Sequence, residues 1–308
     1  MEHTPNTPHV IDLRFQGREQ AIASYLLDNG REAALIETGP ASTLGSLMAG
    51  LSAAGVEPER VTQLLVTHIH LDHAGAAGSL VRLLPNATVC VHEAGAPHLS
   101  DPSKLLSSAT RIYGADMDRL WGEVRPVPPE RLRVLGDGEK FTAGGRELHA
   151  LYTSGHASHH IAYWDPASAS VFTGDVAGIR LPGVKIAVPP TPPPDLDLDA
   201  WSVSIDRLLG LEARTLYLTH FGAAHDVSAH LDNLRARLFA WHDLVLDAFR
   251  RGLDTPQVAL LLEQHANREL SASGLGPGLS DRYRLVSGYE MNVAGFVRYF
   301  RKRGELPG

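Results

Sequence analysis

The sequence predicts an α/β fold followed by a helical C-terminal region. Short apolar runs that favour strands, such as residues 63–67, alternate with helical patterns such as residues 74–84. Asn29-Gly30 lies between two further apolar runs, which is typical of the turn in a β-hairpin. Towards the C-terminus, apolar residues recur at the three- and four-residue spacing of helices. We therefore expect a strand-containing domain over residues 10–225 and a helical extension over residues 226–308 that packs on it.

Two long segments interrupt the alternation of strands and helices. Residues 96–132 carry short helical patterns separated by prolines, and residues 177–199 contain the proline-rich run 189–194. Segments of this length are uncommon as plain connections, and proline stiffens such a segment in an extended path. We expect both segments to form walls of a pocket. For residues 177–199, a plain surface linker is the alternative.

A cluster of polar side chains directly follows the apolar run 63–67. His68 and His70 leave the end of this strand on one side, because side chains two positions apart point the same way in an extended chain. Asp72 and His73 come next, at the entry of the following helix. Imidazole and carboxylate groups together suit divalent transition metals. The cluster therefore predicts a metal site.

This cluster resembles the T-H-x-H-x-D-H-x-G signature of the metallo-β-lactamase superfamily of hydrolases, matched here by residues 67–75. Three later segments resemble those that supply the family's remaining ligands: 153–160, 172–175 and 218–222. The resemblance spans roughly residues 20–225 and implies a four-layer αββα sandwich. Two positions depart from the family pattern, because Ser154 stands where proline is usual and His159 where glycine is usual.

The resemblance also implies a full set of ligands for two divalent metal ions. The ligand positions are His68, His70, Asp72, His73, His156, Asp175 and His220. One ion would be held by His68, His70 and His156. The other would be held by Asp72, His73 and His220, and Asp175 would bridge the two ions. Zinc is the expected metal, with iron or manganese as alternatives. His160 would orient a ligand or pack in the core, and His159 would face the substrate or pack.

Such a pair of ions implies hydrolysis. Metals about 3.5–4 Å apart can share a bridging hydroxide, whose parent water has its pKa lowered to about 7. That hydroxide would attack a carbonyl or phosphoryl group while a metal stabilises the developing oxyanion. Asp72 is the expected catalytic residue, because it can orient the nucleophile or pass a proton to the leaving group. We expect a dinuclear hydrolase that cleaves a small-molecule ester, thioester or lactone.

Other functions on the same fold stay open at this point. The family resemblance also extends to non-haem iron oxidoreductases of the persulfide dioxygenase type, which bind one iron with fewer ligands, and to phosphodiesterases. A non-catalytic metal-binding protein is a further alternative. It would require the open coordination position of the metal to be blocked.

Composition and charge restrict the expected partners. The 308 residues carry a net charge of −7 and no long basic run, so we expect no nucleic-acid partner, since such binding relies on clustered lysine and arginine. No apolar stretch approaches the length of a membrane span, and the first ten residues lack a signal pattern, so we expect a cytoplasmic protein with no membrane partner. The single cysteine, Cys90, excludes an internal disulfide and lies in a strand pattern that predicts a buried thiol. The expected partner is a small-molecule substrate, and the oligomeric state does not follow from the sequence.

Overall fold

The computed structural model describes residues 7–272 and 278–306. The chain divides into two compact units. Unit 1 comprises Met1–Tyr152 and His159–Gly174, and unit 2 comprises Thr153–Ser158 and Asp175–Gly308. The last strand–helix elements before residue 225 thus belong to the same unit as the C-terminal helices. The domain boundary expected between residues 225 and 226 stays a prediction.

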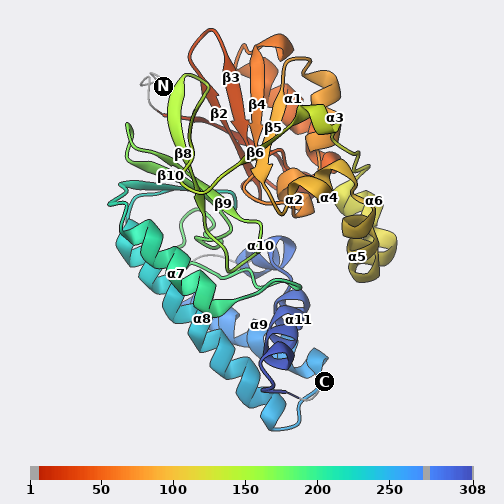
Figure 1. The fold of residues 1–308 in the computed structure, drawn as a ribbon. Helices are drawn as coiled ribbons and strands as arrows, with labels where there is room; N and C mark the ends of the chain where they lie inside the picture. The colour runs from red at the N-terminus through yellow and green to blue at the C-terminus, as the bar shows by residue number, and fades with distance from the viewer. Residues whose placement is uncertain (1–6, 273–277, 307–308) are drawn as a thin grey trace. The chain divides into compact units, whose positions relative to one another are not determined.

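Unit 1 contains a six-stranded sheet in the order β1-β2-β3-β4-β5-β6 (Figure 1). Its strands are β1 (His9–Asp12), β2 (Ala23–Asp28), β3 (Ala33–Ile36), β4 (Val61–Leu65), β5 (Thr88–His92) and β6 (Leu132–Leu135). The first three strands pair antiparallel and the last four pair parallel. The expected hairpin joins β2 to β3, and Gly30 in its turn has a positive φ of 84°. Leu64 and Leu65 of β4 are fully buried, as is usual for a parallel strand covered on both faces.

The second set of strands in unit 1 pairs antiparallel in the order β10-β9-β8-β7. These strands are β7 (Lys140–Ala143), β8 (Arg146–Tyr152), β9 (Ile161–Asp165) and β10 (Ser170–Gly174). They pack on the first sheet: the ring centroids of Tyr25 on β2 and Phe172 on β10 lie 5.4 Å apart. In the same interface, the Tyr163 hydroxyl on β9 donates to the carbonyl of Val66 at 2.7 Å. The expected α/β sandwich is therefore confirmed.

The helices of unit 1 are short. They are α1 (Leu44–Ala53), α2 (Leu71–Ala74), α3 (Ala77–Leu83), α4 (Ala96–Ser100), α5 (Ser103–Tyr113) and α6 (Met117–Trp121), with 3-10 turns at Phe15–Gly17, Ala41–Thr43, Pro58–Arg60, Gly114–Asp116 and Pro129–Arg131. Helix α1 packs on β1, and α3 packs on β5. The segment 96–132 is helical in pieces, as its sequence predicts. Cys90 on β5 is buried, as expected, and burial raises the pKa of its thiol to about 12.

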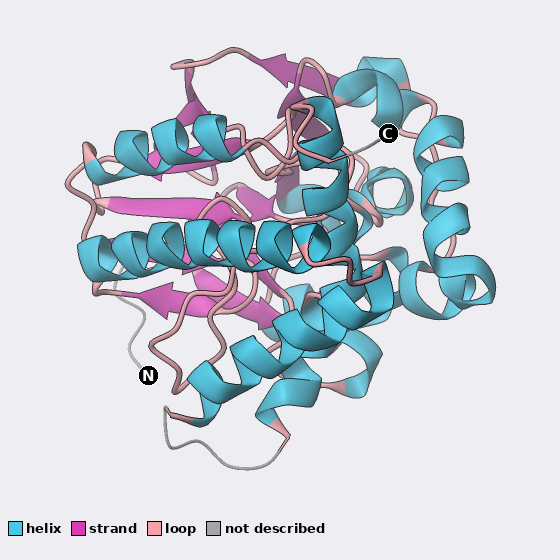
Figure 2. Ribbon diagram, turned by 90° about the horizontal axis from the view of Figure 1, so that it is seen from below, coloured by secondary structure: helices cyan, strands magenta, loops and turns pink. Residues whose placement is uncertain are grey.

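Helices, cyan in Figure 2, make up most of unit 2. Its elements are α7 (Leu198–Leu209), β11 (Thr215–Leu218), β12 (Gly222–Ala224), α8 (Val227–Arg250), α9 (Thr255–Ser271), α10 (Leu279–Val286) and α11 (Tyr289–Lys302). The apolar stripe of α8, including Leu238 and Trp241, is fully buried, which explains the helical spacing in the sequence. Asp254 and Gln257 form a capping box at the start of α9. None of the described helices combines the length and apolarity that crossing a membrane requires.

The segment 177–199 of unit 2 has little regular structure. Only one isolated bridge, between Ile179 and Val188, occurs in it outside the named strands. Residues 187–191 are nevertheless buried. The Asn292 side chain accepts a hydrogen bond from the Thr191 amide at 2.7 Å, which ties the proline-rich run to α11.

Candidate metal centre

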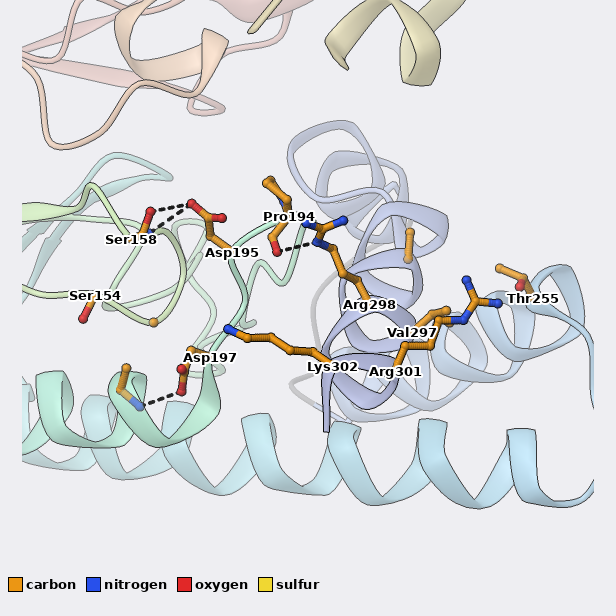
Figure 3. A pocket seen from close by; sticks show the side chains of 13 residues that line it. Ser154, Ser158, Pro194, Asp195, Asp197, Thr255, Val297, Arg298, Arg301 and Lys302 are labelled. Carbon is orange, nitrogen blue, oxygen red and sulfur yellow. Dashed lines mark hydrogen bonds between the residues drawn. The ribbon is translucent and has the colours of Figure 1, made fainter. Parts of the chain in front are cut away.

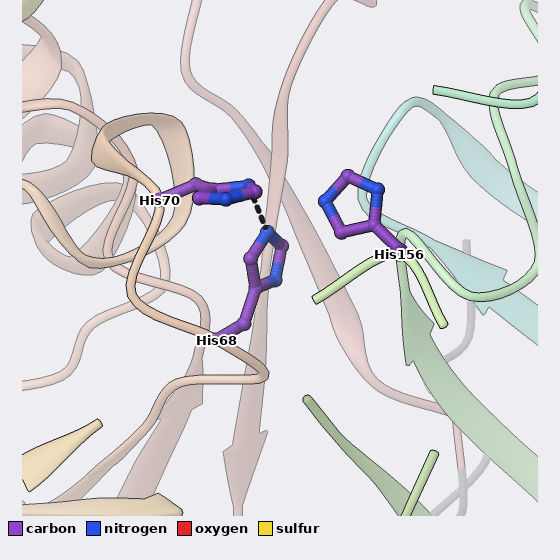
Figure 4. A group of neighbouring side chains, drawn as sticks. All are labelled: His68, His70 and His156. Atoms are coloured by element: carbon purple, nitrogen blue, oxygen red, sulfur yellow. Dashed lines mark hydrogen bonds between the residues drawn. The ribbon is translucent and has the colours of Figure 1, made fainter. Parts of the chain in front are cut away.

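The first part of the expected ligand set lies in unit 1, in the segment that follows β4 and in α2 itself. His68 and His73 are fully buried, and His70 is half-buried. His68 Nε2 lies 2.9 Å from His70 Nδ1, as the dashed line in Figure 4 shows. The rings of His68 and His73 have centroids 3.9 Å apart, and Asp72 Oδ2 lies 3.6 Å from His73 Nε2. This part of the sequence therefore brings its four predicted ligands together, and each belongs to groups of histidine and aspartate side chains that could hold a metal ion.

The Glu37 carboxylate contacts this cluster through His73 and Thr67. Its Oε1 lies 2.9 Å from His73 Nδ1 and accepts a hydrogen bond from the Thr67 hydroxyl at 2.5 Å. The carboxylate is only 1% exposed. A carboxylate on one ring nitrogen fixes the tautomer of a metal-binding histidine and presents the other nitrogen to the metal. Glu37 is thus a positioning residue for His73.

Glu37 is not among the predicted site residues, although its position in the sequence carries a signal. It directly follows β3, which pairs parallel to β4 with Ile36 opposite Leu65. Residues that follow neighbouring parallel strands emerge at the same edge of a sheet. Glu37 therefore reaches the residues that follow β4.

Two further histidines lie beside His68 in unit 1. The His160 ring stacks on that of His68 with centroids 5.0 Å apart, and the His159 ring is 6.2 Å away. Gly174, at the end of β10, has a φ of 50°. A Cβ atom on Gly174 would lie 2.4 Å from the Thr67 hydroxyl and 2.7 Å from His160 Nε2. The glycine of the F-T-G-D segment is therefore required by the packing behind the ligands.

The second half of the expected ligand set lies in unit 2. Asp175 is placed between two histidines, with Oδ2 3.4 Å from His156 Nε2 and Oδ1 3.5 Å from His220 Nε2. All three side chains are buried. They too belong to groups that could hold a metal ion.

The loop that carries His156 is fixed by its neighbours in unit 2. The His156 Nδ1 lies 2.8 Å from the carbonyl of Pro190, so the proline-rich run sets the orientation of this ring. Gly155 has a φ of 133°, and a Cβ atom on it would lie 2.3 Å from the Cα of Trp201. The Gly155 carbonyl accepts a hydrogen bond from the Asp197 amide at 2.8 Å. These contacts involve segments 177–199 and α7, which a sequence pattern cannot place.

Tyr113, in the segment 96–132, lies near enough to Asp72 for that carboxylate to affect its pKa. Burial and, after it, the nearby Asp72 carboxylate raise the pKa of Tyr113 above its ordinary value. Tyr113 is half-buried, and its ring lies 5.0 Å from that of Trp121 in an edge-on arrangement. Its phenol therefore stays protonated.

The comparison with known proteins is consistent with this arrangement. A family model described as the metallo-beta-lactamase superfamily matches residues 17–220. A metallo-beta-lactamase fold-containing protein of Sulfurisphaera tokodaii is 29% identical over 53% of this chain and 62% of its own length. An atrochrysone carboxyl ACP thioesterase of Aspergillus fumigatus is 28% identical over 87% of this chain and 67% of its own. A hydroxyacylglutathione hydrolase of Legionella pneumophila is 25% identical over 36% of this chain and 32% of its own.

Solved structures show the same fold. A metallo-beta-lactamase family protein of Thermus thermophilus superposes with a TM-score of 0.67 at 24% identity, covering 92% of this chain and 89% of its own. The relatives from Sulfurisphaera tokodaii and Legionella pneumophila are matched over less than two thirds of their own length. The family match itself covers more than half of the 308 residues. The chain therefore belongs to the metallo-β-lactamase superfamily, most of whose members are hydrolytic enzymes.

Proposed function

We propose that this protein is a dinuclear metal-dependent hydrolase that cleaves a small-molecule ester, thioester or lactone, with a thioester as the first candidate. The observation that carries the proposal is the pair of histidine and aspartate clusters. His68, His70, Asp72 and His73 form the cluster of unit 1, and the cluster of unit 2 centres on Asp175. Together these two clusters supply every ligand position of the family in its order along the chain.

The chemistry of the donor set fits two divalent ions. Five imidazoles and two carboxylates, buried or half-buried, suit zinc, and they also accept iron or manganese. In the proposed assignment His68, His70 and His156 hold one ion. Asp72, His73 and His220 hold the other, and Asp175 bridges the two.

Thioesters come first among the substrates because of two relatives. One is named an acyl carrier protein thioesterase and another a hydroxyacylglutathione hydrolase, and both names denote hydrolysis of an acyl group on sulfur. No nucleic-acid or membrane partner is part of the proposal. The acidic net charge of −7 agrees with a small-molecule substrate.

In this mechanism, bound metal ions would supply a hydroxide at neutral pH and would polarise the carbonyl of the substrate. Asp72, whose side chain is 21% exposed, would orient the nucleophile and move a proton to the leaving group. A thiolate leaving group needs little help from an acid. Glu37 would keep His73 in the tautomer that binds metal, and the Tyr113 hydroxyl would donate a hydrogen bond beside Asp72.

The test joins elemental analysis to a substrate screen. The protein is loaded with zinc, manganese or iron and assayed on thioesters, lactones, carboxylic esters and phosphodiesters. We expect about two equivalents of metal and the highest activity on thioesters. Asp72→Asn should abolish most turnover, whereas His225→Asn, which changes an exposed histidine outside the ligand set, should not.

Two outcomes would contradict the proposal. The first is metal-loaded, folded protein that turns over no substrate of the panel. The second is a single bound iron together with oxygen uptake on a persulfide, which would indicate an oxidoreductase instead.

A further inference from the structure

A large cavity lies wholly within unit 2, next to the loop that carries His156. Its volume is about 1010 Å³, which is enough for a cofactor-sized molecule. Ser154 and Gly155 line it, and His156 is the next residue in the chain. The cavity therefore adjoins the loop that carries a proposed metal ligand, although His156 itself does not line it.

One wall of the cavity is positively charged. Arg298, Arg301 and Lys302 line it from α11, as Figure 3 shows. The Nε of Arg298 donates to the carbonyl of Pro194 at 2.9 Å, which fixes the guanidinium in place. Among the residues that the structure describes, no carboxylate pairs with Arg298, and Lys302 makes neither an ion pair nor a hydrogen bond. The charges of Arg298 and Lys302 are therefore available to a ligand.

The two acidic residues that line the cavity, Asp195 and Asp197, accept hydrogen bonds from neighbouring residues of unit 2. Asp195 Oδ2 accepts a hydrogen bond from the Ser158 hydroxyl at 2.6 Å (Figure 3). Asp197 caps α7 by accepting from the Ala200 amide at 3.0 Å. Both carboxylates thus stabilise local structure and keep their negative charge, so the lining carries three positive and two negative side chains, with the positive ones gathered on α11.

The neighbouring residue Arg303 provides an internal contrast. It pairs with Asp199 at 2.9 Å and with Glu305 at 2.8 Å, and it does not line the cavity. This basic side chain, which does not line the cavity, is thus paired with carboxylates. In a protein with a net charge of −7, the α11 side of this cavity is positively charged, which suits an anionic ligand.

We infer that this cavity binds the phosphate-bearing tail of the thiol carrier in a thioester substrate, such as a phosphopantetheine group. Arginine and lysine bind phosphate through charge-assisted hydrogen bonds. Ala200, Ala294 and Val297 provide apolar surface for the uncharged part of the tail. The inference rests on the proposed thioester hydrolysis, because it places the acyl–sulfur bond towards His156 and the phosphate towards α11.

The experiment compares three thioesters of one acyl group. The thiol is pantetheine, 4′-phosphopantetheine or coenzyme A, so that the series adds first one phosphate and then the nucleotide. We expect kcat/KM to rise by about tenfold or more from the neutral to a phosphorylated substrate, as one or two charge-assisted hydrogen bonds would give. A rise with the phosphopantetheine thioester indicates that the pantetheine phosphate is bound, and a rise only with the coenzyme A thioester indicates the nucleotide phosphates. Both results support the inference.

Variants then test which side chains of α11 cause the preference for phosphorylated thioesters. Lys302→Gln and Arg301→Gln should lower the ratio of kcat/KM between phosphorylated and neutral thioesters, and Lys302→Glu should lower it further. Arg303→Gln is the matched control, because this arginine is paired outside the cavity, and its ratio should equal that of the wild type. Calorimetry with coenzyme A, which cannot be hydrolysed, tests the same contacts without turnover. Its affinity should fall in the Lys302 and Arg301 variants and weaken with added salt.

The outcomes separate this inference from the proposed function. Equal kcat/KM for all three thioesters, with no binding of coenzyme A, would overturn the inference while hydrolysis stands. Binding of coenzyme A that Lys302→Glu weakens, in a protein that cleaves no thioester, would support the phosphate site and overturn the proposed hydrolysis.

Discussion

At the scale of single residues, two of the predicted ligand histidines have a partner that holds their second ring nitrogen. His73 has the Glu37 carboxylate, and His156 has the Pro190 carbonyl. Each partner comes from a segment distant in sequence from the histidine that it orients. Such partners fix ring orientation and raise the basicity of the ligand, so their loss weakens metal binding without removing a ligand.

Glu37→Gln should therefore lower metal affinity by about 10- to 100-fold. The amide cannot provide the charge that stabilises the His73 N–H, although its shape is nearly unchanged. Metal affinity is measured by competition with a chromophoric chelator. Glu130→Gln, at an exposed position, is the control, and equal affinities in the two variants would refute the role of Glu37.

Tyr113→Phe should lower kcat/KM on the best substrate by a few-fold, as the loss of one hydrogen bond near Asp72 would. Because the pKa of Tyr113 is raised, its phenol is protonated throughout the usual working range, and no basic limb of the pH profile should belong to it. The pH–rate profiles of both proteins check this. A basic limb that disappears in the Tyr113→Phe variant would contradict the protonated phenol.

At the scale of elements, the ligands that share one loop could be predicted, and their supports could not. His68 to His73 lie within six residues, so the alternation of a strand and the start of a helix is enough to group them. Glu37 joins them only because β3 pairs parallel to β4, and the sequence does not state that pairing. The short and largely polar sequence of α10 leaves little apolar periodicity from which a helix could be predicted. The basic wall of α11 also went unnoticed, since exposed charges near a helix end are ordinary until a cavity is known.

Gly155→Ala should disturb the loop that presents His156. The new Cβ would overlap the backbone of Trp201, and a φ of 133° is unfavourable for alanine. We expect a lower melting temperature and reduced metal content, measured by calorimetry and elemental analysis. Gly210→Ala at the end of α7 is the matched control, since its φ of −68° suits alanine and a Cβ would meet only ordinary contacts.

The start of α8 should make the protein sensitive to acid. His230 Nε2 lies 2.7 Å from the Ala177 carbonyl, and its Nδ1 lies 3.2 Å from Arg180 Nη1, so the ring fits as a neutral imidazole. Burial lowers the pKa of His230. The unfolded chain then binds more protons in acid, so the stabilisation is complete above about pH 6.5 and falls as the pH drops below it, by up to roughly 1.4 kcal/mol per unit. Urea unfolding of the wild type and of His230→Gln between pH 5 and 8 measures this, and equal pH slopes would contradict it.

At the scale of the whole molecule, the predicted ligands are divided between the two units. Unit 1 supplies four of them, and unit 2 supplies His156, Asp175 and His220. The family order of ligands could be recognised from sequence, because each ligand lies in a short motif of its own. The cavity of unit 2 could not be recognised, since it is assembled from the loop 153–158, the segment 177–199 and three helices, α7, α9 and α11.

Removal of metal by a chelator should lower stability as well as activity. A ligand that binds only the folded state stabilises it by about 2.7 kcal/mol at a concentration of one hundred times its dissociation constant. Melting temperatures with and without chelator, followed by addition of zinc, measure the effect. An unchanged melting temperature in protein shown to have lost its metal would contradict a metal centre built from these residues.

The path of the chain between the units has a practical consequence. The backbone leaves unit 1 after Tyr152, spends Thr153–Ser158 in unit 2, returns for His159–Gly174 and then leaves again. No single peptide-bond cleavage can therefore release one unit from the other. A chimera that exchanges unit 2 between two family members at one crossover would mismatch the six-residue excursion, so such an exchange requires grafting at all three junctions between the units.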